Sequence, residues 1–525
     1  MATTARKLNP LRAVFRLSPV MMAIALVAPF NALANEQNTS IQQLDQKQVE
    51  THRFHRDHVI GTSLDVVMTG VSKQDAKTAF NAIETEIAHL DKILSTWRAD
   101  SEISSLNQSS TTKTTVSPEL FEVIAACENW RTQTCGAFDA RLGQLITAWE
   151  RSQGISSIDA TTRNQILDHL ESSRVELDET NLTVQTSDQI KFAPDAYAKG
   201  YIIDRALVAA RTAVPTLQGL LVDIGGDMRV WGASPQKVMT QSDAWNIGVQ
   251  DAYNHFDNAA PSQVLSLNDQ AIAFSGQGYR NLADQTHLLD PKTGLPLQHI
   301  EQCVVVGTCA ADTDALATAL AAISPSEGLA LVEALVGYES QLTTADGQIF
   351  QSSGWNNLVQ SQDQGDFRNV ASTSSAKWPS GYQAIIDVTI PKLDVEKYRA
   401  PYVNVWVTDS DKKLVRTLAV WGKDDRWINT NYVWWRRYGR QMTNLDAVAK
   451  PSRQPGQYKL AWDGKDDNGK AVTAGQYQIH IETAREHGDH SYQTMNLEVK
   501  AKASNQTLAA QKEIGAIKLN FQKVN

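Results

Sequence analysis

The sequence predicts two folded regions of different class, an α+β region followed by an all-β sandwich. Between residues 51 and 360, helix-like and strand-like segments alternate, whereas short strand-like runs separated by turns follow residue 381. A polar stretch at 361–380 separates the two patterns and is typical of a linker. A length of 525 residues suits a chain of several domains of roughly 150 residues each.

The overall composition excludes several classes of protein. Hydrophobic residues make up 42% and charged residues 20% of the chain, which is typical of a folded protein. The net charge of −9 gives no broad basic surface, so we expect no nucleic-acid partner. Only one stretch, near the N-terminus, is notably apolar. A polytopic membrane protein needs several such stretches and is therefore excluded.

The first 34 residues are expected to form a cleaved export signal. Four basic residues and no acidic residue precede an apolar run at 20–30, and an Ala-x-Ala motif ends at Ala34. The run is too short to span a bilayer, so we expect cleavage after Ala34, a periplasmic location and no stable membrane span in the mature chain. An uncleaved anchor is the alternative. Residues 35–50 are polar and are expected to form a loose leader.

Three elements of the first region have clear patterns. Apolar residues at helical spacing predict a helix over 75–96. A second helix is expected over 118–132, with Ser117 as its N-cap and Pro118 at its first position. The run 219–224 is expected to be a buried strand that ends at two glycines.

The second region is expected to be a β-sandwich over 381–500. Turns such as Asp463-Gly464 divide its strand-like runs. The last residues, 501–525, are weakly patterned and are expected to be a tail. The expected strands are 385–390, 402–407, 414–421, 458–462 and 477–483.

The cysteine content gives no framework of disulfides or metal ligands. The four cysteines are Cys127, Cys135, Cys303 and Cys309, and no C-x-x-C motif occurs. Thioredoxin chemistry and zinc ribbons are therefore not indicated, and buried, inert thiols are expected.

The segment from Asp312 to Leu320 is the most informative one for chemistry. On a helix, Asp314 and Thr318 are four residues apart and point the same way. A carboxylate and a hydroxyl on one face suit a hard cation such as Mg²⁺. The alternative is structural: Asp312 caps the helix and Thr318 packs.

Two further segments carry candidate groups. His287 lies where a strand enters a turn and is a candidate general base, with a solvated histidine as the alternative. Lys199, followed by Gly200, is a candidate phosphate contact, with an exposed lysine at a helix start as the alternative. Neither a P-loop motif nor a G-x-G-x-x-G after a strand occurs, so P-loop and Rossmann sites are not indicated.

Seven motifs follow one another along the first region. They are Ser95 to Asn107 (including Trp97), Gly136-Ala-Phe-Asp139, Ala198-Lys-Gly-Tyr201, Asp223-Ile-Gly-Gly226, Ser275-Gly276 with Tyr279-Arg280-Asn281, His287 to Gly294, and Asp314 to Thr318. In this order and spacing they resemble the FAD:protein FMN transferase family, the ApbE-like flavin transferases. The resemblance covers roughly residues 55–355 and implies a T-fold-like domain of mixed sheets with helices.

The resemblance also implies an activity. The enzyme would bind FAD with Mg²⁺, split its pyrophosphate, move FMN onto a Ser or Thr hydroxyl of an acceptor protein and release AMP. A metal at the pyrophosphate supplies the positioning and charge neutralisation that such a transfer needs. The chain shows no obvious Ser/Thr-Gly-Ala-Thr acceptor motif of its own, so we expect the acceptor to be a separate flavoprotein.

The residues implied by the resemblance fall into three sets. Asp314, Thr318 and the backbone carbonyl of Ala196 would hold the metal. His287 would take the proton of the acceptor hydroxyl. FAD would contact Ile60, Trp97, Ala137, Phe138, Asp139, Lys199, Leu289 and Ala317.

Three positions depart from the family pattern. Family members usually have Asp-Leu where this chain has Ala193-Pro194, so either Asp195 replaces the missing carboxylate or an adenine contact is lost. Ile60 stands where Met is usual, and Trp97 where Tyr is common. Both keep an apolar or stacking surface.

The second region resembles a periplasmic domain of unknown role found with flavin-linked proteins. Its segments 462–469 and 474–477 resemble the Ig-like module of the flagellar hook-capping protein. The acidic residues at 463–468 lack the spacing of a calcium loop, so a β-turn is expected there. Trp434, Trp435, Arg436 and Arg437 are expected either to form an exposed recognition patch or to pack in the core. This region is a candidate dock for the acceptor.

Three other functions stay open at this point. The chain could be an FAD-binding or flavin-storage protein without transfer, which the departure at Ala193 favours. It could be an FAD pyrophosphatase that uses water as the nucleophile. A non-enzymatic adhesion or assembly module centred on the β domain is the third.

Overall fold

The structure is a computed structural model, and the predicted export signal, its cleavage site at Ala34, His287 and most of the predicted linker lie outside the residues that it describes. Those residues are 50–109, 111–151, 158–187, 190–235, 244–254, 256–277, 281–282, 285–286, 288–360, 377–395, 398–422, 428–441, 449–450 and 452–524.

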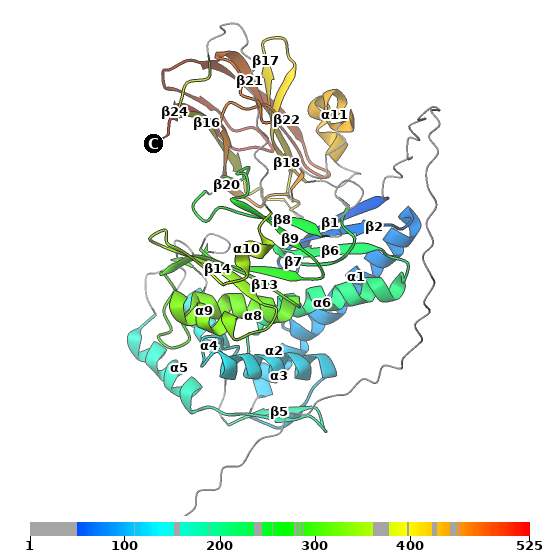
Figure 1. Cartoon of the computed structure of the whole chain (residues 1–525), viewed down its shortest axis with the longest axis vertical. Coiled ribbons are helices and arrows are strands. Elements are labelled where there is room, and N and C mark those ends of the chain that lie inside the picture. Colours follow the sequence, from blue (N-terminus) through cyan, green and yellow to red (C-terminus); the bar gives the residue numbers. More distant parts are fainter. Residues whose placement is uncertain are drawn as a thin grey trace, which may run out of the picture. The chain divides into compact units, whose positions relative to one another are not determined.

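The first region is built on one eight-stranded antiparallel sheet (Figure 1). The predicted buried strand at 219–224 is confirmed as a strand in the sheet interior, and glycines at positive φ follow it. In spatial order the strands are β1 (Thr51–Val59), β2 (Thr62–Thr69), β6 (Gly219–Ile224), β7 (Asp227–Gly232), β10 (Ala271–Gly276), β13 (Ile300–Gly307), β14 (Glu339–Thr344) and β15 (Ile349–Gln351).

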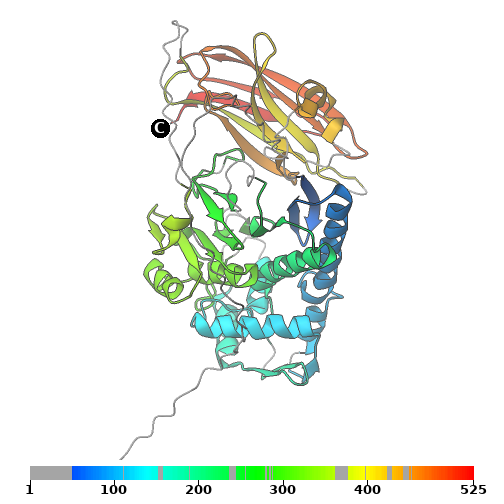
Figure 2. The same ribbon diagram turned by 45° about the vertical axis from the view of Figure 1, so that its right-hand side comes forward.

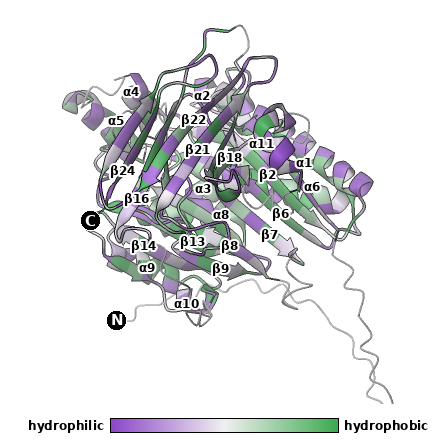
Figure 3. Ribbon diagram, turned by 90° about the horizontal axis from the view of Figure 1, so that it is seen from above, coloured by the Kyte–Doolittle hydropathy of each residue, from purple (hydrophilic) through white to green (hydrophobic). Residues whose placement is uncertain are grey.

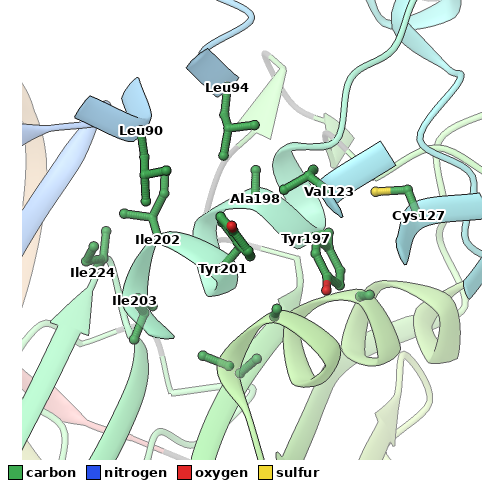
Figure 4. Packing of buried hydrophobic residues seen from close by; sticks show 14 of the residues in the cluster. Leu90, Leu94, Val123, Cys127, Tyr197, Ala198, Tyr201, Ile202, Ile203 and Ile224 are labelled. Carbon is green, nitrogen blue, oxygen red and sulfur yellow. The ribbon is translucent and has the colours of Figure 1, made fainter. Parts of the chain in front are cut away.

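Three long helices pack against this sheet and against one another: α1 (Lys73–Leu94), α6 (Asp195–Ala213) and α8 (Ala310–Ala321). Figure 4 shows side chains of α1 and α6 meeting those of α3 (Pro118–Gln133), with Tyr201 and Ile202 of α6 among them. The region also contains α2 (Glu102–Ser109), α4 (Gly143–Arg151), α5 (Ala160–Ser172), α9 (Pro325–Glu333) and the small sheet β3 (Thr114–Thr115), β5 (Thr183–Thr186) and β4 (Val175–Asp178).

The helix predicted from residue 75 begins two residues earlier, at Lys73, whereas the helix predicted from Pro118 begins at that residue. Ser72 caps α1, because its side chain accepts a hydrogen bond from the Asp75 N–H at 3.2 Å. Ser117 caps α3 in the same way through the Leu120 N–H at 3.3 Å, and Pro118 occupies the first position. None of the helices in the described part of the chain combines the length and the hydropathy that a bilayer crossing requires.

A second, separate core covers the other face of the sheet. It joins Val230, Ile272 and Trp355 to the hairpin of β8 (Trp245–Val249) and β9 (Gln263–Leu267). The short helix α10 (Trp355–Leu358) contributes the tryptophan, which is fully buried. The ribbon β11 (Asn281–Leu282) and β12 (Gln285–Thr286) precedes the turn at 290–294.

The second region consists of a four-stranded and a five-stranded sheet that share one hydrophobic core (Figure 2, yellow to red). Hydrophobic and hydrophilic residues alternate along several of its strands (Figure 3), and strands occupy each of the five predicted ranges. The first sheet has the order β20 (Gly456–Trp462), β16 (Tyr382–Ile390), β24 (Ile517–Lys523) and β23 (Ser504–Leu508); the second has β19 (Ala449–Lys450), β18 (Leu414–Trp421), β17 (Tyr402–Asp409), β21 (Gly475–Ala484) and β22 (His490–Val499).

The structure differs from the expectation of a weakly patterned tail at 501–525. β24 pairs with β16 along its whole length, and β23 pairs with β24. Ile517, Leu519 and Phe521 of β24 are buried in the shared core. Apolar and polar residues alternate over only the seven residues of β24. Its partner strand β16 lies more than a hundred residues earlier in the chain.

The tryptophan–arginine segment forms the short helix α11 (Tyr432–Arg437). Trp434 is fully buried and packs with Trp406, so core packing is confirmed for this residue. Trp435 is half-buried, whereas Arg436 and Arg437 are exposed.

Several hydrogen bonds join the two regions. The Asp257 carboxylate accepts from the Trp421 indole N–H at 2.7 Å and from the Arg453 guanidinium at 2.7 Å. The Asn258 side chain pairs with the backbone of Ala461 in both directions, at 2.7 and 2.9 Å. Asp57 accepts from the Ser452 hydroxyl at 2.5 Å.

The expectation of buried thiols is only partly confirmed. All four cysteines are free; Cys127 and Cys303 are buried, Cys309 is half-buried, and Cys135 is exposed. Burial raises the pKa of the Cys127 thiol well above its ordinary value. Cys135 has a positive φ in the turn that ends α3, which turns it away from the core.

Candidate active site

Polar side chains from four elements converge beside the N-terminal turn of α6. Lys199 of α6 forms an ion pair with Asp227 at the start of β7, and its ammonium lies 3.9 Å from Asp314 of α8. Both carboxylates are almost fully buried. Ser275 of β10 lies 3.4 Å from the Thr318 hydroxyl of α8. A lysine, two carboxylates and two hydroxyls therefore form one cluster, which we call the Lys199 cluster.

The predicted helical pairing of Asp314 and Thr318 is confirmed, since both lie on α8 one turn apart. The start of α8 is fixed by Asp204 of α6, whose carboxylate accepts the Ala310 and Ala311 N–H groups at 3.0 Å each. Asp204 also pairs with Arg229 of β7. A carboxylate on the first N–H groups stabilises a helix start, so α6 and β7 hold α8 in place.

Gly200 brings α6 and α8 close together at the cluster. A Cβ at this position would lie 2.2 Å from the Ala310 carbonyl oxygen, so only glycine permits this approach. The Gly200 N–H donates to the Asp314 carboxylate at 3.3 Å. Ala196, whose backbone carbonyl is the predicted metal ligand, lies one helical turn before Gly200 in α6.

Asp312 faces away from the Lys199 cluster. Its carboxylate accepts from the Trp130 indole at 2.7 Å, the Tyr338 hydroxyl at 3.2 Å and the Cys309 thiol at 3.2 Å. The N-cap residue of α8 is Cys309, so the alternative that Asp312 caps the helix is wrong. Asp312 ties α8 to α3 and to the start of β14.

The segments that carry Trp97, Ala137 and Ala193 lie next to one another. The Thr96 hydroxyl donates to Asp195 at 3.2 Å, and the Ala193 N–H donates to the Ala140 carbonyl at 2.6 Å. Trp97 is 78% exposed, which is unusual for a tryptophan and leaves its ring face accessible. These segments contact the first turn of α6, which directly precedes Lys199 of the Lys199 cluster.

The remaining predicted FAD contacts differ in their surroundings. Ala137 and Phe138 are buried, while the Asp139 carboxylate binds the Arg141 guanidinium at 2.6 and 2.9 Å. Asp139 therefore already has a strong internal partner, a point that sequence reasoning missed.

Ile60 occupies the turn between β1 and β2 with a φ of 41°. Gly225 donates its N–H to the Ser63 carbonyl at 3.1 Å, which places this turn beside the glycine pair that leads to Asp227.

Leu289 and Ala317 are buried in the main core. The turn after Leu289 is closed by the Gly294 N–H, which bonds to the Asp290 carbonyl at 2.7 Å.

The chemistry of the cluster suits a divalent cation with oxygen ligands. Among the described residues no group of three or more His, Cys, Asp and Glu side chains could hold a metal ion. The available donors are Asp314, the Thr318 hydroxyl and backbone carbonyls, and Mg²⁺ commonly takes one or two carboxylates and completes its shell with water and phosphate oxygens. Asp227 and Asp314 are two buried carboxylates beside the Lys199 ammonium, and a buried carboxylate favours a nearby positive charge.

Sequence reasoning missed Asp227 and Ser275 as members of the cluster. Asp227 follows Gly225-Gly226, which by itself reads as a turn. A charged residue at the start of a buried strand is the pattern that could have drawn attention to it, because burial of a charge needs a partner.

Family models match both regions of the chain. The model of the ApbE family matches residues 60–340. A model described as a predicted periplasmic protein (DUF2271) matches residues 383–516.

Two similar relatives carry the name FAD:protein FMN transferase. The one from Vibrio cholerae is 27% identical over 277 residues, which is 50% of this chain and 78% of the relative. The one from Chlamydia muridarum is 29% identical over 265 residues, which is 48% of this chain and 77% of the relative.

Solved structures support the fold. The ApbE protein of Thermotoga maritima covers 59% of this chain with all of its own length, at a TM-score of 0.52 and 24% identity. The apo flavinyl transferase ApbE of Pseudomonas stutzeri covers 60% of this chain with 99% of its own length, at a TM-score of 0.50 and 20% identity.

Proposed function

Because this chain belongs to the ApbE family, we propose that it is an FAD:protein FMN transferase. It moves FMN from FAD to a Ser or Thr hydroxyl of a separate acceptor protein and releases AMP. The observation that carries the proposal is the Lys199 cluster, in which the buried Asp314 and the hydroxyl of Thr318 lie on one face of α8 beside Lys199.

The cluster has the donors that a magnesium ion needs. Asp314, Thr318 and the Ala196 carbonyl would hold Mg²⁺. The bound ion supplies Lewis-acid neutralisation of charge on the pyrophosphate. The buried surroundings strengthen this electrostatic effect, because charges interact more strongly where water is excluded.

The chain's own residues orient FAD. Lys199 contacts the pyrophosphate as a cation, and the exposed ring of Trp97 offers a stacking surface for a flavin or adenine ring. Ile60, Ala137, Phe138, Asp139, Leu289 and Ala317 complete the proposed FAD contacts. Asp195, to which Thr96 donates, lies two residues after Ala193 and would supply the carboxylate missing at that position.

Further parts of the proposal rest on the family resemblance. His287 takes the proton from the acceptor hydroxyl. The protein acts in the periplasm after removal of residues 1–34, which the description of the DUF2271 match supports. The domain boundaries at 51–360 and 381–500, and the T-fold-like and Ig-like architectures, belong to this proposal.

The test is a transfer assay with purified protein, FAD, Mg²⁺ and an acceptor fragment that carries a Ser or Thr flavinylation motif. In-gel flavin fluorescence reports the covalent product, and released AMP reports cleavage of FAD. We expect both products from the wild type. Asp314→Ala is expected to lose both by on the order of 1,000-fold, since a metal site contributes several kcal/mol to such a transfer.

Asp312→Asn is the matched control, because it lies two residues away but faces Trp130. It is expected to keep transfer if it folds, which a thermal unfolding curve checks. Full labelling by Asp314→Ala would contradict the proposed metal site. Free FMN and AMP without labelled acceptor would instead identify an FAD pyrophosphatase, and bound FAD without either product would identify a flavin-binding protein.

A further inference from the structure

Asp227 occupies a special place in the Lys199 cluster. Its carboxylate is 2% exposed. One of its oxygens accepts the Phe274 N–H at 2.9 Å, and the other pairs with the Lys199 ammonium. Both oxygens therefore have a partner within the protein.

Lys199 lies between two carboxylates but is closer to one of them. Its ammonium contacts Asp227 directly, whereas the nearest Asp314 oxygen is 3.9 Å away. The backbone of this turn packs closely against α8, since a Cβ at Gly200 would lie 2.2 Å from the Ala310 carbonyl oxygen. The long, flexible side chain of Lys199 can place its ammonium on either carboxylate.

Whether the Lys199 ammonium contacts Asp227 or Asp314 affects the binding of any cation at Asp314. A lysine ammonium in direct contact with Asp314 would occupy the place of a metal ion and repel it, since like charges in a buried site interact strongly. Asp227 offers Lys199 a carboxylate that is already oriented by the Phe274 backbone. This pairing leaves the ammonium beside the cation site rather than in it.

We propose that Asp227 is a positioning residue, a counter-ion that holds the Lys199 ammonium away from Asp314 and so prevents it from competing with the divalent cation. The inference rests on the proposed function, because it takes Asp314 as a metal ligand. It assigns Asp227 a role distinct from metal ligation, in which it acts through Lys199.

The test is a double-mutant cycle read out by Mn²⁺ binding to the full-length protein without FAD, measured by calorimetry. Asp227→Asn keeps an oxygen for the Phe274 N–H, and Lys199→Met keeps most of the side-chain length. Asp227→Asn is expected to weaken Mn²⁺ binding ~10-fold. Lys199→Met is expected to strengthen binding only ~2-fold in the wild type but ~10-fold in the Asp227→Asn background, because contacting groups couple.

Asp178→Asn is the control for a general loss of charge, because Asp178 pairs with Lys113 on the surface, and it should leave Mn²⁺ binding unchanged. Equal effects of Lys199→Met in both backgrounds would overturn the proposal. A double variant that stays as weak as Asp227→Asn would overturn it as well and make Asp227 a metal ligand.

A second measurement uses only the wild type and therefore tests the proposal even if Asp227→Asn does not fold. In wild-type crystals soaked with Mn²⁺, Lys199 is expected to remain on Asp227; a Lys199–Asp314 contact with Mn²⁺ on Asp227 would overturn the proposal. Failure of the proposed function gives a different result, namely Mn²⁺ binding that Asp314→Ala does not change.

Discussion

Two buried acidic sites, one in each region of the chain, differ in how their charge is balanced. In the second region, Glu482 of β21 is fully buried and accepts the N–H groups of Val433 and Trp434 at 2.8 and 2.7 Å and the His490 ring at 2.8 Å. In the first region, Asp227 and Asp314 lie on either side of the single ammonium of Lys199. Glu482 accepts from two backbone N–H groups of α11 and from a histidine ring, whereas Asp227 and Asp314 both lie near the same lysine ammonium.

Under the proposed function, the difference separates a structural carboxylate from a functional one. A buried charge with several strong donors stabilises the native packing around it, and its removal leaves those donors without an acceptor. A buried charge that awaits a ligand costs stability until the ligand binds, which is a common feature of active sites. Four variants test this contrast, from the largest expected effect to the smallest.

Glu482→Ala is expected to destabilise the second region by about 3 kcal/mol, because two backbone N–H groups and His490 lose their common acceptor. Glu498→Ala, on the neighbouring strand β22, is the control; its side chain is exposed, so its effect should be within about 0.5 kcal/mol. Thermal and urea unfolding measure both. Equal stability of the two variants would contradict a structural role for Glu482.

His55→Gln tests a buried charge that is fully paired in the first region. Burial opposes protonation of His55, but hydrogen bonds to Asp57 and Asp65 outweigh it and raise its pKa from 6.5 to about 9. Protonated His55 therefore stabilises the fold fully below pH 6.5, and this contribution disappears as the pH rises through about 9.

The wild type is expected to exceed His55→Gln in stability by up to about 3 kcal/mol at acidic pH. The gap should close between pH 6.5 and about 9 in unfolding curves recorded across that range. A gap that does not change with pH would show that His55 is not charged in the native protein.

His480→Gln tests the opposite case in the second region. Its ring stacks on Trp406 at 4.8 Å and bonds to Tyr492 and Thr408, and burial lowers its pKa to about 4. Because neutral His480 is favoured in the fold, the stability of the wild type should fall as the pH drops from 6.5 towards 4.

The His480→Gln variant lacks this dependence, so its disadvantage of roughly 1 kcal/mol for the lost ring contacts should shrink at acidic pH. Unfolding midpoints over the same range measure the change. A widening gap at low pH would mean that His480 is protonated in the fold.

Asp314→Asn is expected to have the smallest effect on stability, and an effect of the opposite sign. In EDTA, the loss of one of the two carboxylates around Lys199 should leave stability unchanged or raise it by about 1 kcal/mol. Thermal unfolding with and without Mg²⁺ measures it: Mg²⁺ is expected to stabilise the wild type but not the variant. A loss of stability in EDTA as large as that of Glu482→Ala would make Asp314 a structural residue.

The sequence predicts local structure well wherever a single segment contains the whole pattern. The cap at Ser117, the strand at 219–224 and the helical pairing of Asp314 with Thr318 all depend on residues close together in the chain. β24 has only a short alternating pattern, and its pairing with the distant strand β16 is set by tertiary packing.

In the candidate site, too, only the contacts within one segment could be predicted from the sequence. Asp314 could be found from its spacing to Thr318, but the pairing of Lys199 with Asp227 depends on how α6 packs against β7. The same holds for Asp312, whose direction is set by Trp130 of α3. Which carboxylate faces the site is a property of tertiary packing.

The most direct test of the central claim is the position of a divalent cation in crystals grown with FAD and Mn²⁺. The account predicts an anomalous scattering peak between the Asp314 carboxylate and the Thr318 hydroxyl, in contact with the pyrophosphate of FAD. A peak at another position, or FAD bound with its pyrophosphate away from Lys199 and Asp314, would contradict it.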